Sequence, residues 1–247
     1  MTESGRVQSK FPVSNSRARL KILVTAGPTR EPLDPVRYLS NRSSGKMGYA
    51  VARAAARRGH AVVLVSGPTA LKPPAGVRLA RVNTAAEMLA AVQKHLAWCN
   101  ALVMAAAVAD WRPARLARGK IKKHRGAMRL DLRPTADILM RIRGRKGRRL
   151  FVGFAAETEN LLAGARDKLR RKGLDFILAN DVSRSDIGFD ADDNQVTLLS
   201  ADGRCDEWPR LRKTRLAGRL LRVIEDAAAG RQSAPAPSPA IPPRKQK

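Results

Sequence analysis

The stretch that most constrains the fold of this chain is residues 25–48. An apolar run at 20–24 leads into it, and an alanine-rich segment with helical spacing at 49–58 follows it. A strand, a long loop and a helix in this order predict the first βα unit of a nucleotide-binding α/β fold. We therefore expect a parallel sheet that begins with a strand at 20–26, and a helix that ends before Gly59.

The loop within this stretch has the composition of an anion-binding site. Gly27, Gly45 and Gly48 allow the backbone to turn tightly or to approach a ligand closely. Ser43 and Ser44 stand just before the helix, where a hydroxyl can cap the helix or donate to a phosphate. The N–H groups and the dipole of a helix N-terminus favour negative charge. The sequence therefore predicts a phosphate site at the start of this helix.

Two familiar phosphate-binding patterns do not describe this loop. It has no G-x-G-x-x-G fingerprint, and Met47 follows Lys46 where a Walker A motif requires serine or threonine. An ordinary capped helix after a long loop would also explain the serines. The residues alone leave both interpretations open.

Beyond this unit, apolar strands and helices alternate along the chain. Strands are expected at 61–65, 77–82, 101–107, 150–154 and 174–179. Helices are expected at 84–96, 135–142, 158–172 and 213–227, and a hairpin with an Asp-Gly turn at 195–208. This order predicts a Rossmann-like, doubly wound α/β fold, in which a mostly parallel sheet has helices on both faces and a small β-hairpin extension.

Several segments fall outside this alternation. Residues 112–125 are basic, lack an apolar period and predict a mobile loop, whereas 128–132 alternates like a half-exposed strand. We expect a disordered arm at 1–17, one domain at 18–227, and a disordered Pro/Ala-rich basic tail at 228–247.

The carboxyl ends of the parallel strands predict where a ligand binds. In open α/β sheets, ligands lie beyond these strand ends, where the strand order reverses. This rule brings the loop after Gly27 to one edge of the sheet, together with 107–110, 154–157 and 180–181.

The net charge of the chain is unusual. The chain has 48 Lys and Arg residues against 21 Asp and Glu residues, so its net charge is +27 at pH 7. This excess favours a polyanionic or phosphorylated partner. Nucleic acid is not expected, because aromatic residues make up only 4% of the chain and no helix-turn-helix or zinc-finger spacing is present. A basic surface that only keeps the protein dispersed is the simpler alternative.

Cysteine and histidine positions exclude several kinds of site. Cys99 and Cys205 form no C-x-x-C pair and no disulfide framework. His60, His95 and His124 show no metal-ligand spacing. No secretory signal is visible, and no apolar run is long enough to cross a bilayer. We therefore expect a cytoplasmic protein that does not associate with membranes.

Seven motifs in a fixed order resemble those of one enzyme family. They read TAGPTRE at 25–31, DPVR at 34–37, SNRSSGKMG at 40–48, AAAVAD at 105–110, KIKK at 120–123, GFAAET at 153–158 and ANDV at 179–182. Each motif alone is weak, but their common order over 20–227 resembles phosphopantothenate–cysteine ligase of coenzyme A biosynthesis, also called phosphopantothenoylcysteine synthetase.

The resemblance implies a ligase that joins 4′-phosphopantothenate to L-cysteine. In this family a nucleotide, usually CTP in bacteria, activates the carboxylate as an acyl-nucleotide, and Mg²⁺ accompanies the triphosphate. In many bacteria this domain follows a flavin-dependent decarboxylase in one chain. No such domain is visible before Leu20, so we expect a stand-alone ligase, no flavin, and a separate phosphopantothenoylcysteine decarboxylase.

The resemblance also implies roles for individual residues. Lys120 would stabilise the charge that develops on the α-phosphate, and Asn41 would hold the acyl-nucleotide for aminolysis. Arg37 would reach the substrate of the second subunit in a homodimer. The nucleotide-binding residues would be Gly27, Ser43, Gly45, Gly48, Met104, Ala105, Ala106, Asp110, Lys120, Ala136, Asp137, Ile138, Leu139, Phe154, Lys168 and Lys172. The substrate-binding residues would be Arg37, Asn41, Ala106 and Asp110. The metal ligands stay unknown.

The nucleotide and three rival functions stay open. The family usually has Asn-Pro-Asp-Ile before the short helix, but residues 135–138 read TADI, so both CTP and ATP are candidates. The rivals are a nucleic-acid-binding protein, a Rossmann-type oxidoreductase and a catalytically inactive relative of the ligase. The second rival lacks an acidic residue after the strand at 61–65. The inactive relative is not favoured, because Asn41, Asp110 and Lys120 are all present.

Overall fold

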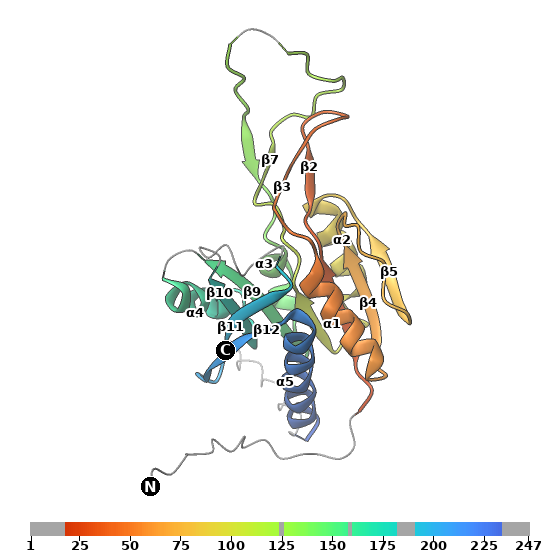
Figure 1. Ribbon diagram of the computed structural model, residues 1–247, viewed down its shortest axis with the longest axis vertical. Coiled ribbons are helices and arrows are strands. Elements are labelled where there is room, and N and C mark those ends of the chain that lie inside the picture. Colours follow the sequence, from red (N-terminus) through yellow and green to blue (C-terminus); the bar gives the residue numbers. More distant parts are fainter. Residues whose placement is uncertain (1–17, 124–125, 158–159, 182–190, 234–247) are drawn as a thin grey trace, which may run out of the picture.

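The computed structural model describes residues 18–123, 126–157, 160–181 and 191–233. Within these residues the centre is an eight-stranded sheet with the order β12-β11-β10-β9-β6-β1-β4-β5 (Figure 1). Its strands are β1 (Lys21–Ala26), β4 (Ala61–Ser66), β5 (Val77–Arg81), β6 (Ala101–Met104), β9 (Leu150–Glu157), β10 (Phe176–Asp181), β11 (Asp193–Ser200) and β12 (Cys205–Arg212). Six of them run parallel, and β11 and β12 form an antiparallel hairpin at one end. The predicted fold class is therefore confirmed.

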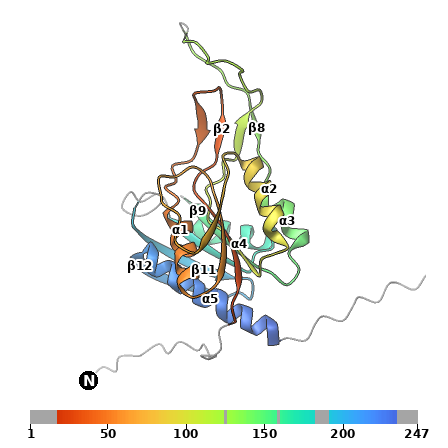
Figure 2. The same ribbon diagram turned by 90° about the vertical axis from the view of Figure 1, so that its right-hand side faces the viewer.

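Helices cover both faces of this sheet (Figures 1 and 2). On one face lie α1 (Lys46–Arg57) and α5 (Lys213–Ser233), and on the other lie α2 (Ala85–Leu96), α3 (Ile138–Ile142) and α4 (Leu161–Arg171). A 3-10 turn, η1 (Arg143–Arg145), follows α3. Alternate residues of a strand point to opposite faces. Ile22 and Val24 accordingly pack with α1 and α5, while Leu23 packs with the other helices.

Helix α1 begins at Lys46, earlier than the predicted residue 49, and its start differs from the expected serine cap. The N-cap residue is Gly45, whose φ of 77° lies in the left-handed region that favours glycine. Ser43 Oγ accepts a hydrogen bond from the Gly45 N–H at 3.4 Å. Ser43 therefore stabilises the turn that precedes the helix, and the sharp change of direction depends on Gly45.

Gly48 allows α1 to lie directly on β1. A Cβ atom at this position would stand 2.5 Å from the Ala26 Cβ and 2.8 Å from the Thr25 carbonyl oxygen. Both distances are far below van der Waals contact, and the Thr25 oxygen belongs to the backbone of a buried strand. The position of the α1 N-terminus above the sheet therefore requires glycine here.

Hydrogen bonds and ion pairs hold helix α5 to the rest of the molecule at three places along its length. At its start, the Lys213 N–H donates to the Asp192 carbonyl oxygen at 2.9 Å. In its middle, Glu225 accepts hydrogen bonds from Arg58 at 2.7 Å and from His60 Nε2 at 3.0 Å. Near its end, Arg231 pairs with the buried Asp175.

Two small antiparallel ribbons project from the body of the molecule as one arm (Figure 1). One ribbon pairs β2 (Arg30–Pro32) with β3 (Tyr38–Ser40), and the other pairs β7 (Trp111–Pro113) with β8 (Leu132–Pro134). The Ala117 N–H donates to the Leu33 carbonyl oxygen at 3.1 Å and joins the two ribbons.

Asp34 ties the two ribbons of the arm together. Its carboxylate accepts hydrogen bonds from the Val36 and Arg37 N–H groups at 2.8 Å and from the Ile121 N–H at 3.1 Å. It also pairs with the Arg37 guanidinium at 2.6 Å. Burial alone would raise the pKa of the Asp34 carboxyl, but these hydrogen bonds outweigh burial and hold that pKa well below its usual range.

The arm and several boundaries correct the sequence-based expectations. The segment 112–125 was predicted as a mobile loop. Of its described residues, 112 and 113 belong to β7, and the Ile121 N–H is bonded to Asp34. The strand predicted at 128–132 lies instead at β8. Strand β6 ends at Met104 instead of residue 107, because the chain then pairs with the loop after β1 through the bridge between Pro28 and Ala107. Helix α5 continues past residue 227 to Ser233, into the predicted tail.

Other boundaries moved by a few residues, and some predictions fall outside the described residues. Helix α3 starts at Ile138 because the Asp137 carboxylate accepts from the Met140 N–H at 3.2 Å. The predicted arm at 1–17, the remainder of the tail at 234–247 and the helix start at Thr158 lie outside the described residues.

A pair of glycine substitutions tests the contact between α1 and β1. Gly48→Ala should lower the free energy of unfolding by about 1–3 kcal/mol, because the added methyl group overpacks a rigid site. Gly218→Ala in α5 is the control: its Cβ would meet nothing within 4 Å, so the variant should gain up to about 1 kcal/mol from helix propensity. Urea unfolding measures both values. Equal effects at the two glycines would contradict the packing role of Gly48.

The Asp34 network predicts a pH-dependent contribution to stability. Asp34→Asn should lower the free energy of unfolding by about 2 kcal/mol at pH 7, because it removes the charge that accepts five hydrogen bonds. Since folding lowers the pKa of Asp34, this contribution is present above about pH 4 and is lost as the pH falls below it.

Urea unfolding of the wild type and of Asp34→Asn from pH 7 to pH 3 measures this difference. The two proteins should become more alike in stability as the pH falls. Asp206→Asn, at an exposed position of β12, serves as the control and should change stability by less than about 0.5 kcal/mol. A difference that grows in acid would contradict the assignment.

Candidate functional site

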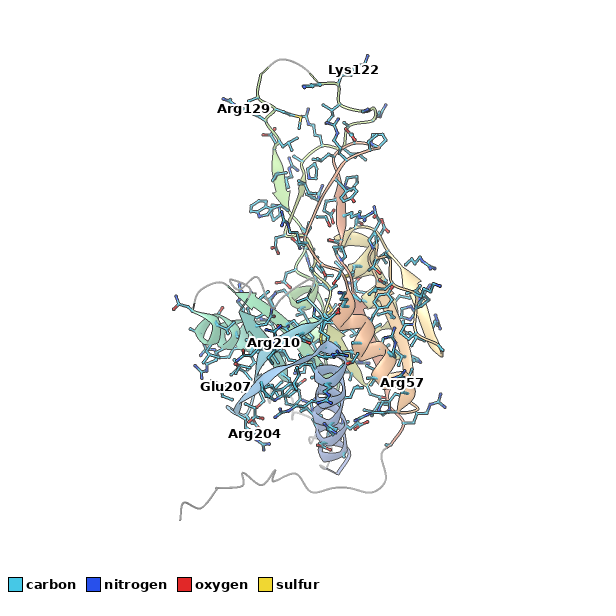
Figure 3. The ribbon with its side chains drawn as sticks, in the orientation of Figure 1. Arg57, Lys122, Arg129, Arg204, Glu207 and Arg210 are labelled. Carbon is cyan, nitrogen blue, oxygen red and sulfur yellow. The ribbon has the colours of Figure 1, made fainter. Side chains whose placement is uncertain are left out.

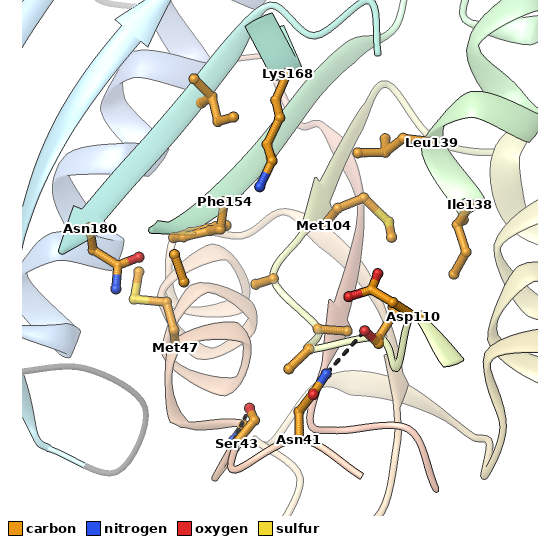
Figure 4. Close-up of a pocket in the computed structure, with 18 of the residues that line it drawn as sticks. Asn41, Ser43, Met47, Met104, Asp110, Ile138, Leu139, Phe154, Lys168 and Asn180 are labelled. Carbon is orange, nitrogen blue, oxygen red and sulfur yellow. Dashed lines mark hydrogen bonds between the residues drawn. The ribbon is translucent and has the colours of Figure 1, made fainter. Parts of the chain in front are cut away.

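A cavity of about 520 Å³ opens at the carboxyl ends of β1, β6 and β9 (Figure 4). After β1 the chain continues toward β4 and β5, and after β6 toward β9 and β10. The cavity therefore lies at the point where the strand order reverses. Its lining combines predicted residues with further ones: Asn41, Arg42, Ser43, Gly45, Lys46, Met47, Met104, Ala105, Ala106, Ala107, Val108, Asp110, Thr135, Ala136, Asp137, Ile138, Leu139, Gly153, Phe154, Ala156, Lys168, Lys172, Leu174, Ile177, Asn180, Asn194 and Lys213.

Backbone and hydroxyl groups fix the segment that follows β6. Pro28 and Ala107 form an isolated parallel bridge, and the Ala107 N–H donates to the Gly27 carbonyl oxygen at 3.0 Å. The buried Thr25 hydroxyl accepts from the Ala106 N–H at 3.2 Å. The small side chains of this segment leave room for a ligand close to the backbone.

Two further threonines fix the end of the same segment, next to Asp110. The buried Thr29 hydroxyl accepts from the Ala109 N–H at 2.9 Å. The Thr135 hydroxyl donates to the Ala109 carbonyl oxygen at 2.6 Å, and the Thr135 N–H donates to the Asp110 carbonyl oxygen at 2.8 Å. Asp110 is therefore held at the cavity wall by residues that belong to different loops.

Asn41 links the two loops that form the cavity mouth. Its side-chain amide donates to the Val108 carbonyl oxygen at 3.0 Å (Figure 4). This contact joins the loop after β3 to the segment after β6. The amide therefore lies on the cavity wall near Asp110, with the geometry of a group that can hold a ligand between the two loops.

Lysines on α4 form one positively charged side of the cavity. Lys168 points toward the cavity beside Phe154 (Figure 4). Lys172, one helical turn later, pairs with the Asp137 carboxylate at 3.0 Å. Burial would raise the pKa of Asp137, but the hydrogen bonds from Lys172 and the Met140 N–H outweigh it and lower that pKa. Both lysines line the cavity, where the family resemblance had implied a nucleotide site.

A second positively charged side was not among the predicted site residues. Lys46, at the start of α1, and the buried Lys213, at the start of α5, line the cavity together with Asn180 and the buried Asn194. The strand-end rule had already brought Asn180 to this edge of the sheet, and the structure places it in the cavity lining. Asn194 and Lys213 carry no such signal, because only the antiparallel return of β11 and β12 brings them to this place.

Four of the predicted site residues do not line the cavity. Gly27, with φ of 74°, packs against Gly67 and Thr69, and Gly48 packs against β1. Gly27 and Gly48 therefore allow close packing behind the loop and the helix that line the cavity. Arg37 and Lys120 do not line it either.

Arg37 and Lys120 belong to the arm. Arg37 bonds to Asp34 and to the carbonyl oxygen of Ile121, the residue after Lys120, at 2.5 Å. Figure 3 shows the neighbouring Lys122 near the tip of this arm. Within one subunit, Arg37 and Lys120 therefore lie on the arm and outside the cavity lining.

The basic run at 141–149 has a structural explanation. Arg143 donates to the Arg171 carbonyl oxygen at the end of α4 at 2.9 Å, and Arg149 donates to the Leu96 carbonyl oxygen at the end of α2 at 2.6 Å. Lys146 donates to the Gly173 carbonyl oxygen at 2.7 Å. Cations at helix C-termini satisfy carbonyl groups and the helix dipole. Arg143, Lys146 and Arg149 therefore have structural partners within the chain.

Two classes of feature are missing from the described part of the chain. It contains no group of three or more His, Cys, Asp or Glu side chains that could hold a metal ion by themselves. None of its helices combines the length and the apolar composition that crossing a bilayer requires.

Curated proteins similar to this chain are bifunctional proteins of coenzyme A biosynthesis. The chain is 47% identical over 215 residues to the coenzyme A biosynthesis bifunctional protein CoaBC of Escherichia coli (strain K12), a match that covers 85% of this chain and 52% of that protein. It is 43% identical over 213 residues to CoaBC of Bacillus subtilis (strain 168), covering 86% of this chain and 52% of that protein. The chain thus spans about half the length of these relatives.

Solved structures and a family model agree with these matches. The crystal structure of the C-terminal domain of CoaBC is 42% identical, with a TM-score of 0.72, covering 85% of this chain and 97% of that one. The Cab2 mutant H337A in complex with phosphopantothenate-cysteine is 18% identical with a TM-score of 0.72, covering 87% and 89%, and shares the fold. The family model matches residues 18–227. This chain belongs to the DNA/pantothenate metabolism flavoprotein C-terminal domain family.

Proposed function

We propose that this protein is a phosphopantothenate–cysteine ligase that uses CTP. The proposal rests on the family and on one observation in the structure. Motifs that are far apart in the sequence, including 40–48, 105–110 and 153–158, contribute residues to a single cavity at the switch point of the sheet. The cavity has cations on two sides and an asparagine and an aspartate near its mouth. This is the chemistry needed to hold a triphosphate and a second phosphorylated substrate.

In the first half-reaction, a carboxylate oxygen of 4′-phosphopantothenate attacks the α-phosphorus of CTP. A bond forms between that oxygen and the phosphorus, and the bond from the α-phosphorus to the oxygen of the β-phosphate breaks. The products are an acyl-cytidylate and pyrophosphate. The protein contributes by positioning the reactants and neutralising charge, and the lysines of the two cavity sides supply that charge.

In the second half-reaction, the amine of cysteine attacks the acyl carbon and CMP leaves. A new amide bond forms, the acyl–phosphate bond breaks, and the amine loses a proton. Asn41 is suited to hold the acyl-nucleotide, since its amide already bridges to Val108 on the opposite loop. Holding the mixed anhydride away from water favours the amine over hydrolysis.

The donor set of the cavity fits a Mg²⁺ that binds with the nucleotide. Magnesium bound to a triphosphate takes one or two protein carboxylates and keeps several waters. The cavity offers two aspartates, and Asp137 is engaged with Lys172. Asp110 is therefore the residue that would hold the ion, whose charge would neutralise the phosphates.

The arm supports a homodimer in which Arg37 and Lys120 serve the cavity of the second subunit. Most of the large apolar side chains that are exposed in the described residues lie on this arm: Val36, Tyr38, Trp111, Leu116, Met128, Leu130 and Leu132. Trp111 is 54% exposed and Leu116 is 61% exposed. Exposed apolar patches of this kind mark protein–protein interfaces.

The same arm explains why Arg37 and Lys120 would act together. Arg37 is bonded to the backbone of Ile121, so it fixes the residue next to Lys120. A second subunit that receives Arg37 from this arm therefore also receives Lys120. Lys120 would then stabilise the charge that develops on the α-phosphate.

Three finer points belong to the same proposal. The reaction needs no flavin, because it changes no oxidation state. A separate phosphopantothenoylcysteine decarboxylase would act on the product. The reaction uses metabolites of the cytoplasm, which is therefore the compartment that we propose.

Pyrophosphate release tests the function directly. With 4′-phosphopantothenate, Mg²⁺ and CTP, the purified protein should release pyrophosphate, and phosphopantothenoylcysteine should form only when cysteine is added. ATP in place of CTP should give a lower kcat/KM. Failure of both nucleotides to release pyrophosphate would contradict the ligase function.

Two variants separate the half-reactions in the same assay. Lys120→Gln should reduce pyrophosphate release by about 100-fold or more, because it removes charge that stabilises the first transition state. Asn41→Asp should still release pyrophosphate once per site and then stall, so that the acyl-nucleotide accumulates. Equal losses in both half-reactions for both variants would contradict the separate roles.

The dimer is tested through the exposed face of the arm. Trp111→Glu should shift the protein from dimer to monomer in sedimentation velocity and reduce turnover, because a charge in an apolar interface is costly. Met140→Glu on α3, at a residue that is 37% exposed, should remain dimeric and active. An active monomeric wild type would contradict the proposed exchange of the arm.

A further inference from the structure

A second cavity, of about 630 Å³, lies beside the first two turns of α1. Its walls come from the start of α1, from β11 and β12, and from the start of α5 (Figure 3 labels Arg210 on β12). Its lining is Lys46, Tyr49, Ala50, Arg53, Leu71, Ala191, Asp192, Asp193, Arg210, Arg212, Lys213 and Thr214. None of the motifs that carry the family resemblance predicts a site here, apart from the helix start that it shares with the first cavity.

The lining of this cavity is predominantly cationic. Five of its side chains are Lys or Arg, and two are Asp. The two aspartates pair with cations of the same wall: Asp192 with Lys46 at 2.7 Å, and Asp193 with Arg210 at 3.3 Å. Positive charge therefore exceeds negative charge in the cavity, and the starts of two helices, α1 and α5, add their dipoles.

The second cavity adjoins the candidate active site. Lys46 and Lys213 line both cavities. Two successive residues at the start of β11 point to different cavities: Asn194 lines the first and Asp193 lines the second. Cations therefore continue from the first cavity, through Lys46 and Lys213, to Arg53 and Arg212 in the second.

We propose that the second cavity binds inorganic pyrophosphate and is the route by which this product leaves the active site. The proposal rests on the proposed function, which makes pyrophosphate the first product. A compact anion with several charges fits a wall of lysine and arginine. A nucleobase does not fit, because Tyr49 is 5% exposed and its hydroxyl is bonded to Ser66 at 3.1 Å, which leaves little ring surface for stacking.

This route separates the product from the other reactants. The base of the arm adjoins the mouth of the first cavity, because Asn41 follows β3 and Asp110 precedes β7. The second cavity leads away on the side of β12 and α5. Departure of pyrophosphate on that side leaves the mouth open for cysteine while the acyl-nucleotide stays bound.

Calorimetric titration with inorganic pyrophosphate, at a fixed Mg²⁺ concentration, tests the site without turnover. The double variant Arg53→Gln, Arg212→Gln changes two exposed residues that line only the second cavity. It should bind pyrophosphate about tenfold more weakly than the wild type, because it loses two charged contacts. Arg57→Gln, one turn further along α1 and outside both linings, should bind within about twofold of the wild type.

Further variants decide where the anion sits. Arg53→Gln alone should show part of the loss and covers the case in which the double variant folds poorly. Lys168→Gln, which changes only the first cavity, should weaken pyrophosphate binding less than the double variant does. The proposal is wrong if the double variant binds as tightly as the wild type, if Lys168→Gln weakens binding more than the double variant does, or if the wild type binds no pyrophosphate.

Turnover distinguishes this proposal from the ligase function. During turnover, pyrophosphate should inhibit the double variant about tenfold more weakly than the wild type, while the KM for 4′-phosphopantothenate stays unchanged. If inorganic pyrophosphate binds in a way that depends on Arg53 and Arg212, but neither CTP nor ATP gives pyrophosphate release, the anion site is supported and the ligase function is contradicted. If CTP gives pyrophosphate release, but the double variant binds pyrophosphate and is inhibited by it as the wild type is, the ligase function is supported and the exit route is contradicted.

Discussion

The pairing between the two loops that leave β1 and β6 is the interaction on which the rest of this structure depends. The two strands are neighbours, but the chain leaves them in opposite directions. Their loops would expose backbone N–H and C=O groups at a buried edge, which is costly. The bridge between Pro28 and Ala107 and the hydroxyls of Thr25 and Thr29 satisfy these groups. The crevice between the loops becomes the cavity, and their continuations become the two ribbons of the arm.

Local signals in the sequence were sufficient for the sheet and for much of the cavity. Apolar runs predicted the parallel strands, and the strand-end rule brought the loop after Gly27, residues 107–110 and Phe154 to one edge. Helix α2 also begins where the sequence predicted a helix, because the Thr84 hydroxyl caps it and accepts from the Glu87 N–H at 3.2 Å. Each of these features depends on a few consecutive residues and on a general rule of the fold.

Features that depend on distant partners could not be predicted in the same way. The segment that contains Ile121 looks like a solvated loop in the sequence, because the carboxylate that receives the Ile121 N–H, Asp34, lies far away along the chain. Lys213 looks like one cation in a basic chain until the hairpin of β11 and β12 brings it to the cavity. Gly48 looked like part of a phosphate cradle, although its lack of a side chain serves packing.

The three fastening points along α5 make the position of Lys213 a property of the whole molecule. A helix of 21 residues spans roughly 30 Å and behaves as a rod. It is held beside the cavity at one end, by Glu225 in the middle, and by the pair of Arg231 with Asp175 at the other end. A shift of the rod at the distant pair would therefore move a cation at the first cavity, so residues that touch no ligand help to set the local electric field there.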